Sequence, residues 1–166
     1  MPRVTSVLAA GHRHDRPVID TVILDYAQRG AQKTTVTGVK GVTYEIALAE
    51  PVRLRTDDLL QLDDGSLVEV IAAPEVLIEA RAADVAALSR LAWHLGDRHL
   101  PVQVLTNRIR ARQDAGVEAL LKSLGTKTTL IEAPFEPEGG AYAPRRHEHA
   151  HDHDHHHHHD HDDLHD

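Results

Sequence analysis

The first half of the chain alternates short apolar runs with turn residues. Six such runs, each rich in β-branched residues, predict strands: Val4–Leu8, Thr21–Tyr26, Thr34–Thr37, Val42–Leu48, Leu59–Leu62 and Leu67–Ile71. The sequence Asp63-Asp64-Gly65 separates the last two runs and predicts a hairpin turn, because glycine readily adopts the positive φ that such turns need. The pattern therefore predicts a small all-β domain over residues 1–73.

The pattern changes at Pro74, after which helix-like periodicity appears. Val76–Arg81 predicts a strand, and Asp84 predicts the N-cap of a helix that runs to Leu95, with Gly96 just beyond its end. At about 100° per residue, the apolar positions of this helix form one stripe that comprises Val85, Leu88, Leu91, Ala92 and Leu95. Trp93 and His94 fall outside that stripe.

The remaining segments complete a second domain. Pro101–Leu105 and Arg108–Arg112 predict a hairpin of two short strands around Thr106-Asn107. A helix over Asp114–Leu124, ended by Gly125, precedes a last strand, Thr128–Glu132. The order strand, helix, strand, strand, helix, strand is the ferredoxin-like motif. The predicted fold class is α+β: an all-β domain, a ferredoxin-like βαββαβ domain over residues 74–143, and a linker and tail over residues 144–166.

Composition excludes several classes of protein. The chain of 166 residues has no cysteine, which excludes disulfides, zinc-thiolate sites and cysteine nucleophiles. The formal net charge is −8, of which residues 147–166 supply −7, so residues 1–146 carry only −1. A nearly neutral body with one Trp and one Phe lacks the basic surface of a nucleic-acid-binding protein.

Hydropathy indicates a protein that stays in solution. The only apolar run near the N-terminus, Val7–Ala10, is too short for a signal peptide, and no window approaches eighteen apolar residues. We therefore expect a cytoplasmic protein without a membrane partner.

The strongest chemical signal is the His/Asp-rich tail, His147–Asp166. It contains eleven of the fifteen histidines, seven carboxylates and no Lys or Arg. With almost nothing apolar to bury, it is expected to be disordered when free. Neutral imidazole binds divalent nickel, copper and zinc well, so the candidate metal ligands are His147, His149, His151, His153, His155, His156, His157, His158, His159, His161 and His165. The alternatives are an expression tag or a merely solvated polar tail.

In the folded body, the strongest candidate for a metal site is the sequence WHLGDRHLP at Trp93–Pro101. A short loop there places His99 directly before a strand. One histidine is a poor metal site, but two chains paired about a two-fold axis would supply two imidazoles, with Trp93 covering part of the partner surface. His94 is a second candidate ligand. The alternative is that His94 and His99 are ordinary polar residues at a helix end. His12 and His14 form an H-x-H pair that is at best an accessory site.

No sequence pattern indicates catalysis. The nucleotide-binding patterns G-x-x-x-x-G-K-[ST] and G-x-G-x-x-G are absent, as is G-x-S-x-G. The letters H-E-x-x-H occur only as HEHAH at His147–His151, inside the tail that is expected to be disordered and not on a helix, where the catalytic motif has to lie. We therefore expect a protein that is not an enzyme.

Together, HLGDRHLP, the helix that ends in Leu124-Gly125, PFEPEGGAY at Pro134–Tyr142 and the His-rich tail resemble the urease accessory protein UreE family. The resemblance implies a nickel metallochaperone that acts as a homodimer and binds Ni²⁺ between paired histidines of a G-N-R-H motif, here Gly96-Asp97-Arg98-His99. It also implies assistance from His147, His149 and the tail. The implied partners are the urease apoprotein and other urease accessory proteins, including the GTPase.

The chain departs from the family pattern at two places. Asp97 stands where the family usually has Asn, which adds a carboxylate beside the ligand, and no histidine lies among Arg112–Ala115 to form a second site. Copper and zinc are expected to compete with nickel in vitro. The alternative function is a general divalent-metal buffer or storage protein in which the tail is the whole function.

Overall fold

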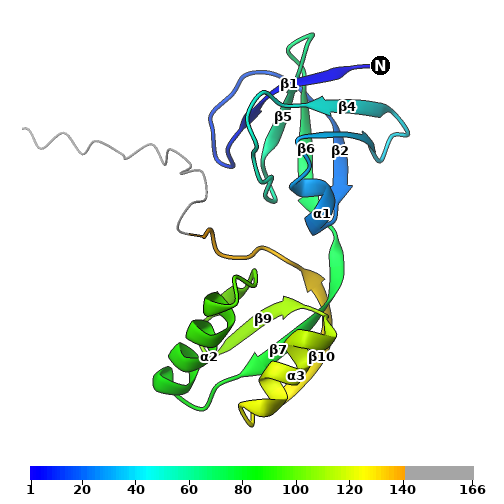
Figure 1. Cartoon of the computed structure of the whole chain (residues 1–166). Helices are drawn as coiled ribbons and strands as arrows, with labels where there is room; N and C mark the ends of the chain where they lie inside the picture. The colour runs from blue at the N-terminus through cyan, green and yellow to red at the C-terminus, as the bar shows by residue number, and fades with distance from the viewer. Residues whose placement is uncertain (141–166) are drawn as a thin grey trace, which may run out of the picture.

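The structure is a computed structural model that describes residues 1–140, and it consists of two domains joined end to end (Figure 1). The N-terminal domain is a curled sheet, and the C-terminal domain combines a sheet with two helices. The linker between them is a single residue, because one strand ends at Ala72 and the next begins at Pro74. The expected disorder of residues 144–166 concerns a segment outside the described residues.

The six predicted strands of the first domain are all present. They are β1 (Arg3–Leu8), β2 (Val18–Leu24), β3 (Lys33–Thr37), β4 (Thr43–Ala47), β5 (Leu59–Leu62) and β6 (Leu67–Ala72). Their order in the sheet is β2-β6-β5-β1-β4-β3, with β2 parallel to β6 and β1 parallel to β4. The hairpin between β5 and β6 turns at Gly65, whose φ of 85° explains the glycine. Alternating apolar side chains of these strands fill one core.

The prediction that a strand extends to Tyr26 is wrong. The strand β2 ends at Leu24, and a short helix, α1 (Tyr26–Arg29), follows it. Asp25 caps this helix in a capping box, because its carboxylate accepts from the Gln28 main-chain N–H while the Gln28 side chain accepts from the Asp25 main-chain N–H. The D-x-x-Q spacing was the sequence signal for this helix.

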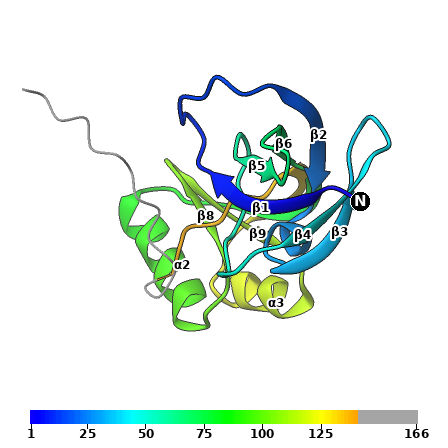
Figure 2. The same ribbon diagram turned by 90° about the horizontal axis from the view of Figure 1, so that it is seen from above.

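The second domain has the predicted ferredoxin-like order of elements. They are β7 (Pro74–Arg81), α2 (Val85–Asp97), β8 (Gln103–Leu105), β9 (Arg108–Arg112), α3 (Ala115–Ser123) and β10 (Thr128–Pro134). The strands lie in the order β10-β7-β9-β8, and both helices cover one face of the sheet (Figures 1 and 2). The core lies between the helices and the side chains of Ile78, Ala80, Ile109 and Ala111.

Arg29 joins the two domains. Its side chain is almost fully buried, donates to the main-chain oxygens of Leu54 and Phe135, and lies 3.6 Å from the Glu136 carboxylate. Burial lowers the pKa of the Arg29 guanidinium, and the charge of Glu136 opposes that shift. A buried charge has to be paired to be tolerated, so these contacts favour the joined arrangement.

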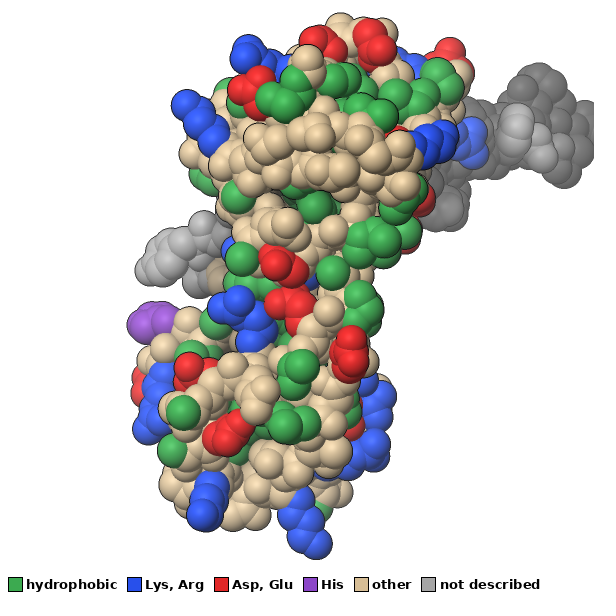
Figure 3. Space-filling view, turned by 90° about the vertical axis from the view of Figure 1, so that its right-hand side faces the viewer, with side chains coloured by type: hydrophobic (Ala, Val, Ile, Leu, Met, Phe, Trp, Pro, Cys, Tyr) green, Lys and Arg blue, Asp and Glu red, His purple; other side chains and the backbone are tan. Residues whose placement is uncertain are grey.

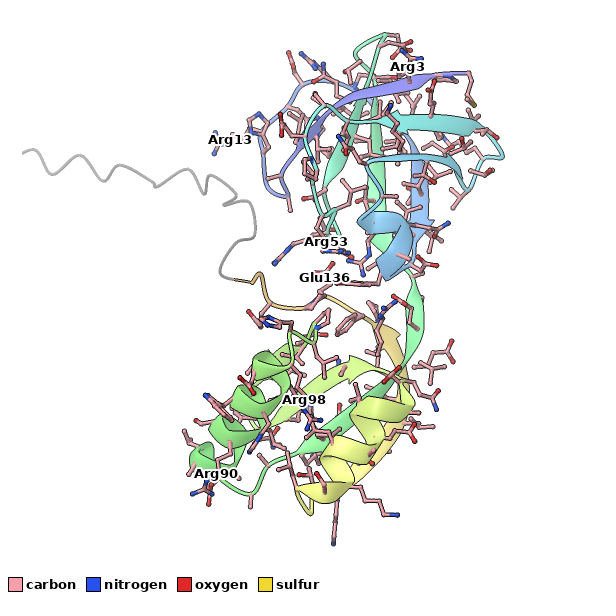
Figure 4. The ribbon with its side chains drawn as sticks, in the orientation of Figure 1. Arg3, Arg13, Arg53, Arg90, Arg98 and Glu136 are labelled. Carbon is pink, nitrogen blue, oxygen red and sulfur yellow. The ribbon has the colours of Figure 1, made fainter. Side chains whose placement is uncertain are left out.

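Further polar contacts surround Arg29. The main-chain N–H of Thr56 donates to Glu136 over 2.7 Å, and that of Tyr26 donates to Glu75 over 2.8 Å. The guanidinium of Arg53 lies 3.9 Å from the centre of the Tyr26 ring. Figure 4 shows Arg53 and Glu136 close together where the domains meet, and Figure 3 shows acidic and basic side chains gathered at this waist.

Candidate metal centre

The candidate ligand His99 lies in the turn that ends α2. The prediction that the helix stops at Leu95 is wrong, because Gly96 remains helical and the helix continues to Asp97. The main-chain N–H of His99 donates to Gly96 O over 2.9 Å, and that of Leu100 donates to Leu95 O over 3.1 Å. These two bonds form a Schellman motif, and the apolar contact that accompanies it comes from Leu100, which packs on the core that contains Leu95.

This turn places His99 in the left-handed region, with φ of 56°. Glycine usually fills that position, and a residue with a Cβ costs about 1–2 kcal/mol there. The side chain of His99 is exposed, so burial does not explain the choice of residue. Because backbone strain of this kind clusters at functional sites, the conformation supports His99 as a candidate ligand.

The side chains of α2 lie as the helical periodicity predicted, with the exception of Val85. Trp93 is 63% exposed, and His94 is half-buried with its ring 5.1 Å from the Trp93 ring at an angle of 83°. Val85 was assigned to the buried stripe, but it is 76% exposed at the first position of the helix. The exposed surface of α2 therefore carries Val85 and Trp93.

The last described residues approach this helix end. The main-chain N–H of Glu138 donates to Val102 O over 2.8 Å, and its carboxylate accepts from the Val104 N–H over 3.3 Å. Val102 follows His99 by three positions. Figures 1 and 2 show the segment after β10 crossing the domain towards the C-terminal end of α2. The described part of the chain therefore ends two residues after a contact with the segment that follows His99.

Within residues 1–140, no group of three or more His, Asp or Glu side chains gathers into a metal site. A metal ion bound by His99 would therefore need at least part of its ligands from another copy of the chain or from residues 141–166. The tail candidates, His147 to His165, lie outside the described residues. His14 lies in the loop between β1 and β2, where its Nδ1 is 3.0 Å from Arg16 O.

Two features near this centre were missed by sequence reasoning. The left-handed conformation of His99 depends on where α2 ends, and Gly96 suggested an earlier end than the structure has. The contact of Glu138 with the strand after His99 joins segments that are far apart in sequence, and no local pattern signals it. Across residues 1–140, no helix is long and apolar enough to span a membrane.

Comparison with known proteins gives consistent matches along the chain. Residues 4–73 match the family model of the UreE urease accessory protein, N-terminal domain, and residues 75–161 match that of the C-terminal domain. The urease accessory protein UreE of Rhodopseudomonas palustris (strain BisB18) is 49% identical over 87% of this chain and 68% of its own length. The corresponding protein of Chelativorans sp. (strain BNC1) is 40% identical over 89% of this chain and 91% of its own length.

Proposed function

The chain belongs to the UreE family of urease accessory proteins, which are chaperones of urease maturation and not enzymes, and from this membership we propose that it is a nickel-binding metallochaperone. In this proposal the His/Asp-rich tail captures Ni²⁺, a histidine site at a dimer interface holds it, and the protein delivers it to apo-urease in the cytoplasm. The observation that carries the proposal is the exposed, left-handed His99, three residues before Val102, which accepts a hydrogen bond from Glu138 near the end of the described residues.

A dimer turns one imidazole into a usable site. If two copies meet about a two-fold axis at the end of α2, each His99 faces its twin and the exposed Trp93 is covered by the partner. Imidazole is a good ligand for nickel, copper and zinc, so zinc and copper compete in vitro. His94 is adjacent on the same helix, and histidines of the tail complete the coordination.

Delivery requires binding of intermediate strength. At a Kd of about 1 μM and an association rate of about 10⁶ M⁻¹s⁻¹, the ion leaves in about a second. A closed structural site of roughly −14 kcal/mol would hold it for hours. An exposed histidine site at a subunit interface therefore suits transfer better than a buried one.

In this proposal the N-terminal domain binds the partner proteins. Its curled sheet is anchored to the metal-binding domain through Arg29 and Glu136, so a protein docked on it is held at a defined position relative to His99. The partners are apo-urease and the other urease accessory proteins, including the GTPase.

Isothermal titration calorimetry with Ni²⁺ tests the two sites separately. A variant truncated after Arg146 keeps about one tight site per dimer while the total stoichiometry falls. In that background, His99→Ala removes the tight site, whereas the matched variant His14→Ala leaves it intact. Loss of all binding on truncation alone would contradict the interface site.

The alternative function, a metal buffer that consists of the tail alone, is favoured by the concentration of histidine there. A urease activation assay in cells separates the two. The metallochaperone predicts that the truncated protein retains activation that His99→Ala then removes. The buffer predicts that truncation abolishes the effect and that His99→Ala in the full chain has none.

A further inference from the structure

The face of the C-terminal sheet that the helices leave uncovered carries a cluster of arginines. Strand alternation directs Ile78, Ala80 and Ile109 into the helical core, so Glu79, Arg81, Arg108 and Arg110 lie on the opposite face. Arg81 pairs directly with Arg108 across the two strands, and Glu79 pairs with Arg110. We call Arg81, Arg108 and Arg110 the arginine patch.

The patch holds more positive charge than its own carboxylate neutralises. The Glu79 side chain is 7% exposed and lies 2.9 Å from Arg110, 3.5 Å from Arg108 and 3.5 Å from Arg81. One carboxylate among three guanidinium groups leaves a net charge of +2. The Nε of Arg108 is buried against Glu79, whereas the side chains of Arg81 and Arg108 are 63% and 32% exposed. The exposed parts of these two guanidinium groups can donate to another anion.

Folding stability alone does not account for this arrangement. Arg110 is sufficient to pair the buried Glu79, since it makes the shortest contact and a hydrogen bond. Placing Arg81 directly opposite Arg108 sets like charges against each other, which destabilises a strand pair. A bound carboxylate would relieve that repulsion, and the planar guanidinium suits carboxylates through paired N–H donors.

The chain itself supplies a matching anion. The His/Asp-rich tail has seven carboxylates without a basic residue, and it carries −7 of the net charge of −8. The segment that leads to the tail runs along the face of the sheet that carries the arginine patch. There the Glu136 N–H donates to the side chain of Gln103, which pairs with Arg110. The first tail carboxylate, Glu148, lies eight residues after Gly140, a reach of up to roughly 28 Å. The arginine patch lies on β7 and β9, at most two strand spacings from β8, which is only about 10 Å. Glu148 is therefore close enough along the chain to reach it.

We propose that the His/Asp-rich tail docks through its carboxylates on the arginine patch of the same chain when no metal is bound. The inference goes beyond nickel delivery, because it rests on the charge of the two segments and requires no ion. Bound metal adds positive charge to the tail and weakens the docking, so loading and release of the tail are coupled.

Paramagnetic relaxation in the full-length protein tests the proposal. The chain has no cysteine, so Ala150→Cys carries a single nitroxide label. In EDTA and low salt, the label more than halves the amide peak intensities at residues 79–81 and 108–110 and leaves those of β3 unchanged. The double variant Arg81→Gln, Arg108→Gln loses this broadening, whereas Arg90→Gln on the exposed side of α2 retains it. Arg110 stays in place to pair Glu79.

Three outcomes of the measurement on the singly labelled chain would overturn the proposal. They are absence of broadening at the patch, broadening that persists in the double variant, and broadening that persists when the seven tail carboxylates are replaced by amides. A mixture of isotope-labelled chain without nitroxide and unlabelled chain with nitroxide identifies the source of the tail. Broadening in that mixture would assign the patch to the partner's tail and contradict docking within one chain. Because the test contains no metal, its failure leaves the nickel proposal standing.

Discussion

The two helices of the C-terminal domain end in the same turn but carry different residues at its left-handed position. After α3, Gly125 has φ of 67°, and its N–H and that of Thr126 donate to Lys122 O and Leu121 O. After α2, the equivalent bonds form around His99, with φ of 56°. The turn itself asks only for a left-handed residue, and Gly125 meets that need without cost. The turn after α2 therefore does not need a histidine at position 99, which supports the proposal that the imidazole binds metal.

The largest effect is expected when the two ends are made alike. His99→Gly keeps the turn and removes the imidazole from both copies, so the tight nickel site is lost. Removing support for a metal ligand typically costs about 10–100-fold in affinity, and removing the ligand itself costs at least as much. Competition titration of nickel on the variant truncated after Arg146 measures the change. Unchanged affinity in His99→Gly would remove position 99 from the site.

The second test places a side chain where α3 has none. Gly125→Ala lowers the free energy of unfolding by about 1–2 kcal/mol, because an added Cβ is unfavourable at positive φ. A Cβ at position 125 has no neighbouring atom within 4 Å, so the effect comes from the backbone alone. Urea denaturation measures it. The matched control is Gly96→Ala inside α2, which has equally open space and raises stability by roughly 0.5–1 kcal/mol.

The third test looks for the strain at α2 directly. His99→Gly raises the free energy of unfolding by up to about 1 kcal/mol, because glycine adopts the left-handed region without a Cβ penalty. His99→Asn leaves the free energy of unfolding nearly unchanged, since asparagine tolerates the left-handed region. It abolishes nickel binding at the tight site, as His99→Gly does. Thermal unfolding without metal is the measurement. A destabilised His99→Gly protein would mean that the imidazole makes stabilising contacts in the free chain.

The smallest effect is expected at the residue that distinguishes this turn from the family pattern. Asp97 is exposed, two positions before His99. Asp97→Asn lowers nickel affinity by no more than about fivefold, because an exposed charge contributes at most about 1 kcal/mol. The difference shrinks as salt is raised to about 0.5 M. A larger, salt-independent loss would mean that the Asp97 carboxylate binds the metal directly.

The sequence predicted the elements and their order well where local signals exist. Apolar alternation located the strands, Asp84 and Asp114 marked the helix starts, and both carboxylates cap their helices. The ferredoxin-like order followed from that list, and the sheet order agrees with it. The positions where the helices end were predicted less accurately. Gly125 ended α3 as expected, whereas Gly96 did not end α2, because a glycine marks a helix end only if its backbone leaves the helical region.

Contacts between distant segments could not be predicted. Arg29 was unremarkable in sequence, yet it is buried at the joint between the domains. The arginine patch likewise depends on the register of β7 against β9, which places Arg81 opposite Arg108. Hydrophobic periodicity indicates which face a residue occupies and not which residue stands across from it. The pairing of His99 with a second histidine is likewise a contact that no local pattern determines, and it stays a prediction.

The contact between Arg29 and Phe135 bears on the order of events during synthesis. The two residues are 106 positions apart, and the first domain is complete in sequence at Ala72. Domains generally fold as they emerge from the ribosome, the N-terminal one first. The first domain therefore forms while the acceptors of its buried guanidinium from Phe135 and Glu136 are still untranslated. The joint between the domains closes only when β10 and the two residues after it have been made, so the buried charge of Arg29 waits for its partners until late in synthesis.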